Sequence, residues 1–179
     1  MLLALLVLAG CQTTGDSGFS GSGVQIDRDV NYALTNLYES NPTAKMLAKQ
    51  AKGILVFPSI VKAGFMVGAQ YGSGGALRVR GRTVGYYNSL AASYGLQAGV
   101  QSFGYALFFM NEAAMEYLNR SEGWEIGVGP SIVIVDAGVA KSLTTTTAKD
   151  NVYAFIFDQK GLMAGLGIQG SKITRIYPD

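Results

Sequence analysis

A chain of 179 residues is about the length of one domain, and 49% hydrophobic against 15% charged residues is too apolar a composition for a disordered chain. The 14 basic and 12 acidic residues leave a formal charge of +2, too small to indicate nucleic-acid binding from overall electrostatics. Histidine is absent, which excludes Ser-His-Asp triads, Cys-His pairs and metal sites built on histidine.

The chain opens with an apolar run that ends at its single cysteine, MLLALLVLAGC. Leu8 to Cys11 resembles a bacterial lipobox, which implies that residues 1–10 are a signal peptide, removed when Cys11 becomes diacylated. The run is too short to span a bilayer, which needs about 20 residues. It also lacks the basic residue that usually opens a secretory signal, and an upstream start would supply one. A buried N-terminal strand with a core cysteine is the alternative.

The residue after the cysteine bears on where the lipoprotein is sorted. Gln12, rather than Asp, follows Cys11. By resemblance to the enterobacterial sorting pattern, this favours the outer membrane, with the domain facing the periplasm or the cell surface. Residues 11–26 are rich in Gly, Ser and Thr, a composition typical of a flexible tether. We therefore divide the chain into residues 1–10, 11–26 and a domain over 27–179.

Two helices are predicted at the start of this domain. From Asp27, apolar residues recur at helical spacing until Asn41-Pro42 interrupts them, and Asp27 and Asp29 resemble the acids that favour a helix start. Ser40 or Asn41 caps a second helix, with Pro42 at its first position and Gly53 closing it after Lys52. Lys45, Lys49 and Lys52 then line one flank of this second helix as a basic ridge.

The stretch KAGFMVGAQYGSGG, residues 62–75, alternates with a period of two, as expected of a strand. It contains no phosphate-loop motif and no dinucleotide motif. Its pattern returns as GLQAG at residues 95–99 and GLMAG at 161–165, so three strands each present an apolar face, which we expect to be packed, and a nearly bare glycine face. Glycine within strands marks sharp bends or close approach. We predict a coiled, barrel-like sheet with a helix on its smooth side, the bare face serving packing or, alternatively, a lipid-chain groove.

Most of the remaining chain also has strand character. GGALRVRGRTVGYY predicts a hairpin that turns near Arg80-Gly81-Arg82, and four further segments are strand-like: SFGYALFFM, EIGVGPSIVIV, NVYAFIF and SKITRIY. One inserted helix is predicted at NEAAMEYLNRS, with Asn111 as its cap. Residues 137–150, with four threonines, are predicted to form a loop. The fold class is therefore α+β: an antiparallel sheet of Gly-rich strands, two N-terminal helices and one inserted helix.

Three stretches carry a family resemblance: AKGILVFPSIVKAGFMVGAQYGSGGALRVR, YGLQAGVQSFGYALFFMNEAAMEYL and DQKGLMAGLGIQGSKITRIY. Together they resemble the SYLF domain, also called DUF500, from Asp27 onward. The most specific part is Gly53 to Pro58 followed by Lys62 to Phe65. The resemblance implies a lipid-binding module, associated in eukaryotic relatives with phosphoinositides and actin patches. An exported bacterial lipoprotein would not meet actin in its own cell, so the resemblance implies lipid affinity more than actin binding.

Basic side chains are the candidates for binding anionic headgroups. They are Lys45, Lys49, Lys52, Lys62, Arg78, Arg80 and Arg82. The three arginines alternate along one strand face, where their mutual repulsion would be relieved by an anion. Two alternatives remain for these side chains: the lysines serve solubility, and the arginines protect a sheet edge against aggregation.

We therefore expect a membrane-anchored lipoprotein that binds anionic, phosphoinositide-like lipid headgroups. No pair of carboxylates stands out, so we expect no enzyme, no metal and no cofactor, although a carboxylate pair made by folding is an alternative that sequence does not reveal. Nucleic acid is not an expected partner. The rival function is a structural or protein-interaction lipoprotein of the cell envelope, whose partner would be an envelope or host protein.

Overall fold

The computed structural model describes residues 21–120, 124–126, 131–135, 140, 143–144 and 148–179. In chain order the elements are α1 (Gly23–Ser40), α2 (Pro42–Ala48), β1 (Gly53–Val79), β2 (Arg82–Phe109), α3 (Glu112–Arg120), β3 (Trp124–Ile126), β4 (Ile132–Ile134) and β5 (Val152–Ile176). The predicted α+β class, with two N-terminal helices and one inserted helix, is confirmed. Cys11, the signal peptide and most of the tether lie outside the described residues, as does much of the predicted loop at 137–150.

The sheet consists mainly of three very long strands, ordered β1-β2-β5-β3. β1 pairs antiparallel with β2, and β2 pairs antiparallel with β5 along almost its whole length. One part of the prediction needs correction, because the short strand β4 runs parallel to β5 and the sheet is therefore mixed. Within the described residues β1 forms no ladder with β5, so the sheet curls without closing.

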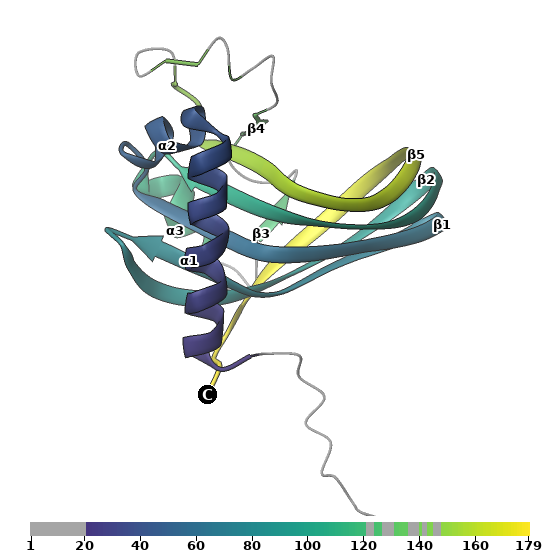
Figure 1. Ribbon diagram of the computed structural model, residues 1–179, viewed down its shortest axis with the longest axis horizontal. Helices are drawn as coiled ribbons and strands as arrows, with labels where there is room; N and C mark the ends of the chain where they lie inside the picture. Colours follow the sequence, from purple (N-terminus) through teal and green to yellow (C-terminus); the bar gives the residue numbers. More distant parts are fainter. Residues whose placement is uncertain (1–20, 121–123, 127–130, 136–139, 141–142, 145–147) are drawn as a thin grey trace, which may run out of the picture.

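The three long strands bend together and turn back, which gives the sheet two arms (Figure 1). The bend of β1 lies at an irregularity between Phe65 and Val67, where Met66 has a positive φ of 61°. The three glycine repeats meet here, since Gly64 pairs with Gly99 and Gly99 pairs with Met163. Sequence repeats far apart in the chain therefore form adjacent parts of one bend, in agreement with the prediction of a coiled, barrel-like sheet.

The first arm of the sheet is covered on both faces. α1 and α2 bury Val30, Leu37 and Leu47 in one cluster with the first-arm residues Phe108 and Phe155, whose rings meet edge to face at 4.9 Å. The other face of this arm contributes a second cluster that includes Phe57, Leu107 and Phe109, packed against the second arm and α3. Two-sided burial explains why these segments are continuous apolar runs in the sequence.

The glycine face of the repeats points inward, where the two arms approach each other. A Cβ built on Gly72 would lie 2.7 Å from Ile60, and one built on Gly64 would lie 2.5 Å from the Cα of Gly68. Gln70, Ser89 and Ser93 are buried on this inner face. The bare face therefore serves packing of the sheet on itself, and α1 does not cover it, so the predicted helix on the smooth side is wrong.

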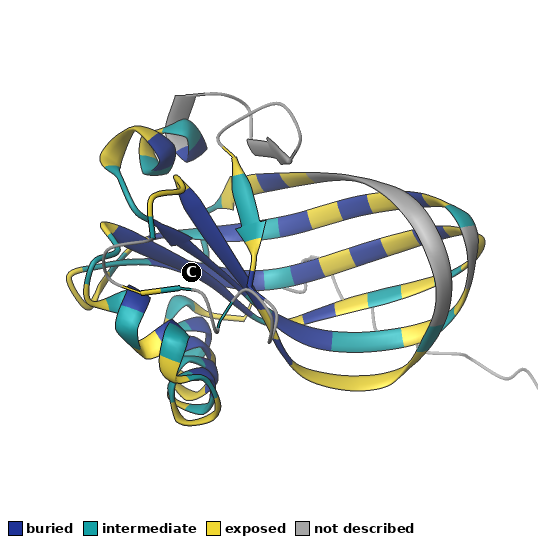
Figure 2. Cartoon of the chain, turned by 90° about the horizontal axis from the view of Figure 1, so that it is seen from above, coloured by how far each residue is buried: buried dark blue, intermediate teal, exposed yellow. Residues whose placement is uncertain are grey.

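The apolar face of the repeats is exposed, which corrects the expectation that it is packed. Figure 2 shows the resulting alternation of buried and exposed positions along the outer part of the strands. We call the exposed side chains of this surface the outer apolar face; they are Val61, Ala63, Phe65, Val67, Ala69, Tyr71, Leu90, Ala92, Tyr94, Ala98, Val100 and Leu162.

Helix boundaries differ from prediction in two places. α1 begins at Gly23, because the Ser22 side chain caps it by accepting from the Gln25 backbone N–H, so Asp27 lies inside the helix rather than at its start. α2 ends at Ala48, well before Lys52. The predicted caps Asn41 and Asn111 are confirmed, since each side-chain oxygen accepts the backbone N–H three residues later, at 3.0 and 2.8 Å.

Candidate functional site

Basic residues from two separate segments meet in a pocket of about 440 Å³ between the helices and the β1–β2 hairpin. Lys49, at the C-terminal cap of α2, lines it together with Arg78 near the end of β1 and Arg80 in the turn. The other lining residues are uncharged, some of them apolar and some polar, and no acidic side chain lines the pocket. Its lining residues therefore carry three positive charges and no negative charge.

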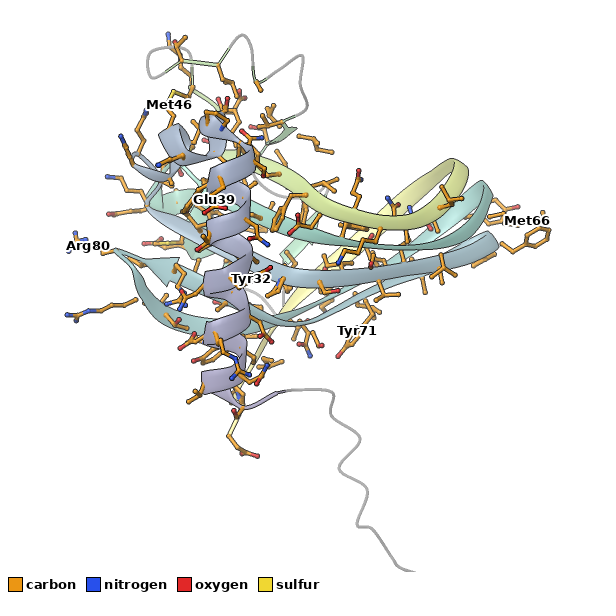
Figure 3. All side chains as sticks on the ribbon, viewed as in Figure 1. Tyr32, Glu39, Met46, Met66, Tyr71 and Arg80 are labelled. Atoms are coloured by element: carbon orange, nitrogen blue, oxygen red, sulfur yellow. The ribbon has the colours of Figure 1, made fainter. Side chains whose placement is uncertain are left out.

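The hairpin positions Arg78 and Arg80 differently. Val79 pairs with Arg82, and Arg80 and Gly81 both have positive φ, 51° and 77°, as in the tight turns that suit hairpins. The predicted turn is thus confirmed. The prediction that the three arginines share one strand face is wrong, because Arg80 lies in the turn and Arg82 begins the opposite strand. Arg80 extends away from the sheet at the hairpin end (Figure 3).

Arg78 is the most buried cation of the pocket, with 13% of its side chain exposed. Its Nη2 donates to the Asn31 Oδ1 at 2.7 Å and to the Asp27 carbonyl at 3.2 Å, and lies 3.7 Å from the Asp27 carboxylate. Its Nε is buried and has no hydrogen-bond partner among the described residues. A buried donor without an acceptor is rare in proteins, and an anionic oxygen would supply the acceptor.

Asp27 is shared among several donors, which limits how far it neutralises the pocket. Its carboxylate accepts from the Thr83 hydroxyl at 2.6 Å and from the Tyr86 hydroxyl at 3.3 Å. Burial, with the negative charge of Asp27 as a smaller cause, raises the pKa of Tyr86, so this phenol stays protonated as a donor. Asp27 and Arg78 therefore fix α1 against the hairpin, and Lys49 and Arg80 remain as the exposed cations of the pocket.

Tyr38 of α1 adds a further polar group to the pocket wall. Burial raises the pKa of Tyr38, so its hydroxyl remains protonated at physiological pH and can donate to an anion. Leu34, Ala48 and Ala51 provide an apolar surface beside the cations. This combination suits a ligand with an anionic group joined to an apolar part.

The other predicted basic residues lie elsewhere. Lys45 is exposed on α2, and Lys52 is exposed after the helix, where its backbone N–H donates to the Phe109 carbonyl. Arg82 is exposed at the start of β2, and Lys62 lies on β1 toward the bend. None of these four lines the pocket. The predicted basic ridge is therefore shorter than expected, and of its three lysines Lys49 alone lines the pocket with Arg78 and Arg80.

Sequence reasoning missed Asn31 and Tyr38. Both face the hairpin from α1, and their spacing of seven residues is the signal that could have placed them on one side of that helix. Within the described part of the chain, no cluster of three or more Cys, Asp or Glu side chains could hold a metal ion. In that same part, no helix combines the length and the hydropathy needed to cross a membrane.

The fold and the pocket define a small α+β domain with a pocket lined by three basic side chains and no acidic one. Residues 90–176 match the family model described as Ysc84, Las17-binding protein actin regulator. This match, over slightly less than half of the chain, agrees with the resemblance to the SYLF family. The comparison with curated proteins gives no match. The Gly53 to Phe65 motif and the pocket precede the matched residues, although β1 pairs with β2 throughout and belongs to the same sheet.

Proposed function

We propose that this chain is a lipid-anchored protein of the outer membrane whose domain binds the anionic headgroup of a lipid. The observation that carries the proposal is the pocket in which Lys49, Arg78 and Arg80 meet beside an apolar wall. The match of residues 90–176 to the family model supports it, because the SYLF resemblance implies lipid binding. The phosphate group is the shared chemistry, since phosphoinositide-like headgroups and free phosphates present the same oxygens to arginine and lysine.

The pocket is tested by the double substitution Lys49→Gln with Arg80→Gln. Both side chains are exposed, so the fold should persist. A basic side chain near an anionic surface contributes about 1 kcal/mol, so losing two should weaken binding to phosphatidylinositol-phosphate vesicles by about 30-fold. Flotation of vesicles with the Cys11→Ser chain measures this without the acyl anchor. Inorganic phosphate, added as a competitor, distinguishes a lipid headgroup from free phosphate as the ligand. Low concentrations of inorganic phosphate should release the chain from the vesicles only if the pocket is a site for free phosphate.

The matched control is Lys45→Gln with Arg82→Gln, which removes the same charge from exposed positions outside the pocket. Under the proposal this variant keeps most of its affinity for the same vesicles. Equal weakening by both double variants would show that only total charge matters. No weakening by either would reject headgroup recognition and favour the structural or protein-interaction lipoprotein.

Anchoring is tested at Cys11. The Leu8 to Cys11 segment supports acylation, so Cys11→Ser should abolish incorporation of labelled fatty acid and leave the precursor uncleaved. Globomycin, which blocks lipoprotein signal cleavage, should give the same precursor with the unmodified chain. Unchanged mature mass and unchanged detergent partitioning of the Cys11→Ser variant would disprove the lipobox. Fractionation of the unmodified chain checks whether it is in the outer membrane.

A further inference from the structure

The outer apolar face forms a continuous ladder around the bend of the sheet. Its rows are set by strand pairing: Ala63 lies beside Val100 and Leu162, then Phe65 beside Ala98, and Val67 beside Tyr94. At one end of the ladder Val61 lies in the row of Lys160, and at the other Leu90 pairs with Lys172. Cross-strand partners share a face, so the apolar rows are bounded by lysine at both ends.

The exposure of this face is large for apolar side chains. Leu162 is 88% exposed, Phe65 77% and Tyr94 69%. Charged residues are absent from the sequence between 63 and 77, between 83 and 109, and between 161 and 171. Contiguous apolar surface that lacks interspersed charge marks an interaction surface rather than ordinary solvent-exposed sheet.

The outer apolar face is not an unfinished part of the protein's own core. The inner face has no room for further side chains, since a Cβ added at Gly64 or Gly72 would come within 3 Å of another part of β1. The helices pack at the end of the sheet opposite the bend (Figure 1). The apolar side chains are therefore left for a partner outside the described chain.

We propose that the bend of the sheet inserts its outer apolar face into the surface layer of a lipid bilayer. Lys160 and Lys172 are exposed and would then lie at the level of anionic headgroups, where their charge is favourable. A second copy of the chain fits less well, because facing two such surfaces would bring like-charged lysines together. Insertion is shallow, since the outer edges of β1 and β5 at the bend carry backbone groups with no ladder partner among the described residues, and hydrocarbon would not satisfy these groups.

This inference rests on the proposal that the domain contacts lipid, but not on the headgroup pocket. Arg80 and Met66 lie at opposite ends of the sheet (Figure 3). One flat membrane therefore does not engage the pocket and the bend together. The bend would hold the domain on a bilayer while the pocket faces away from that surface and takes its ligand separately.

The experiment places an environment-sensitive fluorophore on the bend of the full chain carrying Cys11→Ser, in which an introduced cysteine is the only thiol. Phe65→Cys and Leu162→Cys report on the bend, and Arg80→Cys reports on the opposite end. Vesicles of phosphatidylcholine, alone or mixed with phosphatidylglycerol, provide the surface. We expect a blue shift and quenching by chain-brominated lipid at positions 65 and 162, and neither at 80. The comparison among labels is independent of what brings the chain to the vesicle.

A second measurement uses partition rather than fluorescence. Phe65→Ser with Leu162→Ser should lower partition into phosphatidylcholine vesicles by about 100-fold, about tenfold for each side chain withdrawn from lipid. The pocket variant Lys49→Gln with Arg80→Gln should leave partition into these neutral vesicles unchanged, so a failure of the pocket and a failure of the bend are distinguishable. The inference would be overturned if the fluorophores at 65 and 162 remained in an aqueous environment on vesicle-bound chains. Unchanged partition of the double serine variant would also overturn it. If the fluorophores showed a blue shift in the absence of vesicles, and this shift grew with protein concentration, the outer apolar face would instead bind a second copy of the chain.

Discussion

Phe108→Ala is expected to lower the free energy of unfolding by about 3 to 5 kcal/mol, the usual cost of removing a buried aromatic ring. Phe108 has no exposed surface and lies in the cluster that joins α1 and α2 to the first arm of the sheet. Its ring meets Phe155 edge to face, an arrangement that adds to simple burial. Denaturant unfolding measures the effect as a lower midpoint at constant slope.

Phe65→Ala is the matched control, because it makes the same chemical change where the ring is 77% exposed. The free energy of unfolding should change by less than about 0.5 kcal/mol. The pair separates the two roles of phenylalanine in this sheet, one in the core and one on the outer apolar face. A large loss from Phe65→Ala would mean that the bend is packed against something in solution, and a small loss from Phe108→Ala would mean that the helices do not depend on this cluster.

Local features of the fold could be predicted from the sequence because their causes are local. The Arg80-Gly81 turn follows from Gly81, which adopts a positive φ without steric cost, and the caps at Asn41 and Asn111 follow from a side chain that reaches its own helix. The three glycine repeats likewise predict three strands, since a period of two depends only on neighbouring residues. Their meeting at one bend agrees with the prediction that glycine marks a sharp turn of the sheet.

The direction of each strand face could not be predicted in the same way. Alternation separates two faces but does not state which one is inside. The usual rule places apolar side chains inward. At this bend, however, the two arms approach each other so closely that the inner face holds glycine, and the larger side chains of Phe65 and Tyr94 point outward. Backbone approach therefore overrides hydropathy here.

The candidate pocket was only partly predictable for a related reason. Lys49, Arg78 and Arg80 were all candidates, but their meeting depends on how α1 and α2 pack against the hairpin. The contact that sets this packing joins Arg78 to Asp27, 51 positions away. Asp27 was predicted to be a helix-start acid, so its contact with Arg78 was not predicted. Arg78 was predicted to be one of three arginines on a strand face, so its burial was not predicted either.

Gly99→Val is expected to destabilise the domain by about 2 to 4 kcal/mol, combining overpacking with a strained backbone. Gly99 has φ of 140°, a conformation that residues with a side chain rarely adopt. A Cβ at this position would overlap the Leu162 carbonyl oxygen and lie 2.9 Å from the Cα of Met163. Both obstacles are backbone atoms of the paired strand β5, so the neighbour cannot move aside by changing a rotamer.

The adjacent residue provides the control, because Ala98 is exposed on the outer apolar face, the opposite face of β2 from Gly99. Ala98→Val adds a β-branched side chain to a strand surface that suits it, and the melting temperature should stay nearly unchanged. Gly99→Ala should already produce most of the loss, since the first side-chain carbon makes the contact. Equal stability of Gly99→Ala, Gly99→Val and Ala98→Val would mean that β2 and β5 are not in close approach at the bend. The requirement for glycine at position 99 would then have no physical cause, because the contact with the Leu162 carbonyl is what excludes a side chain there.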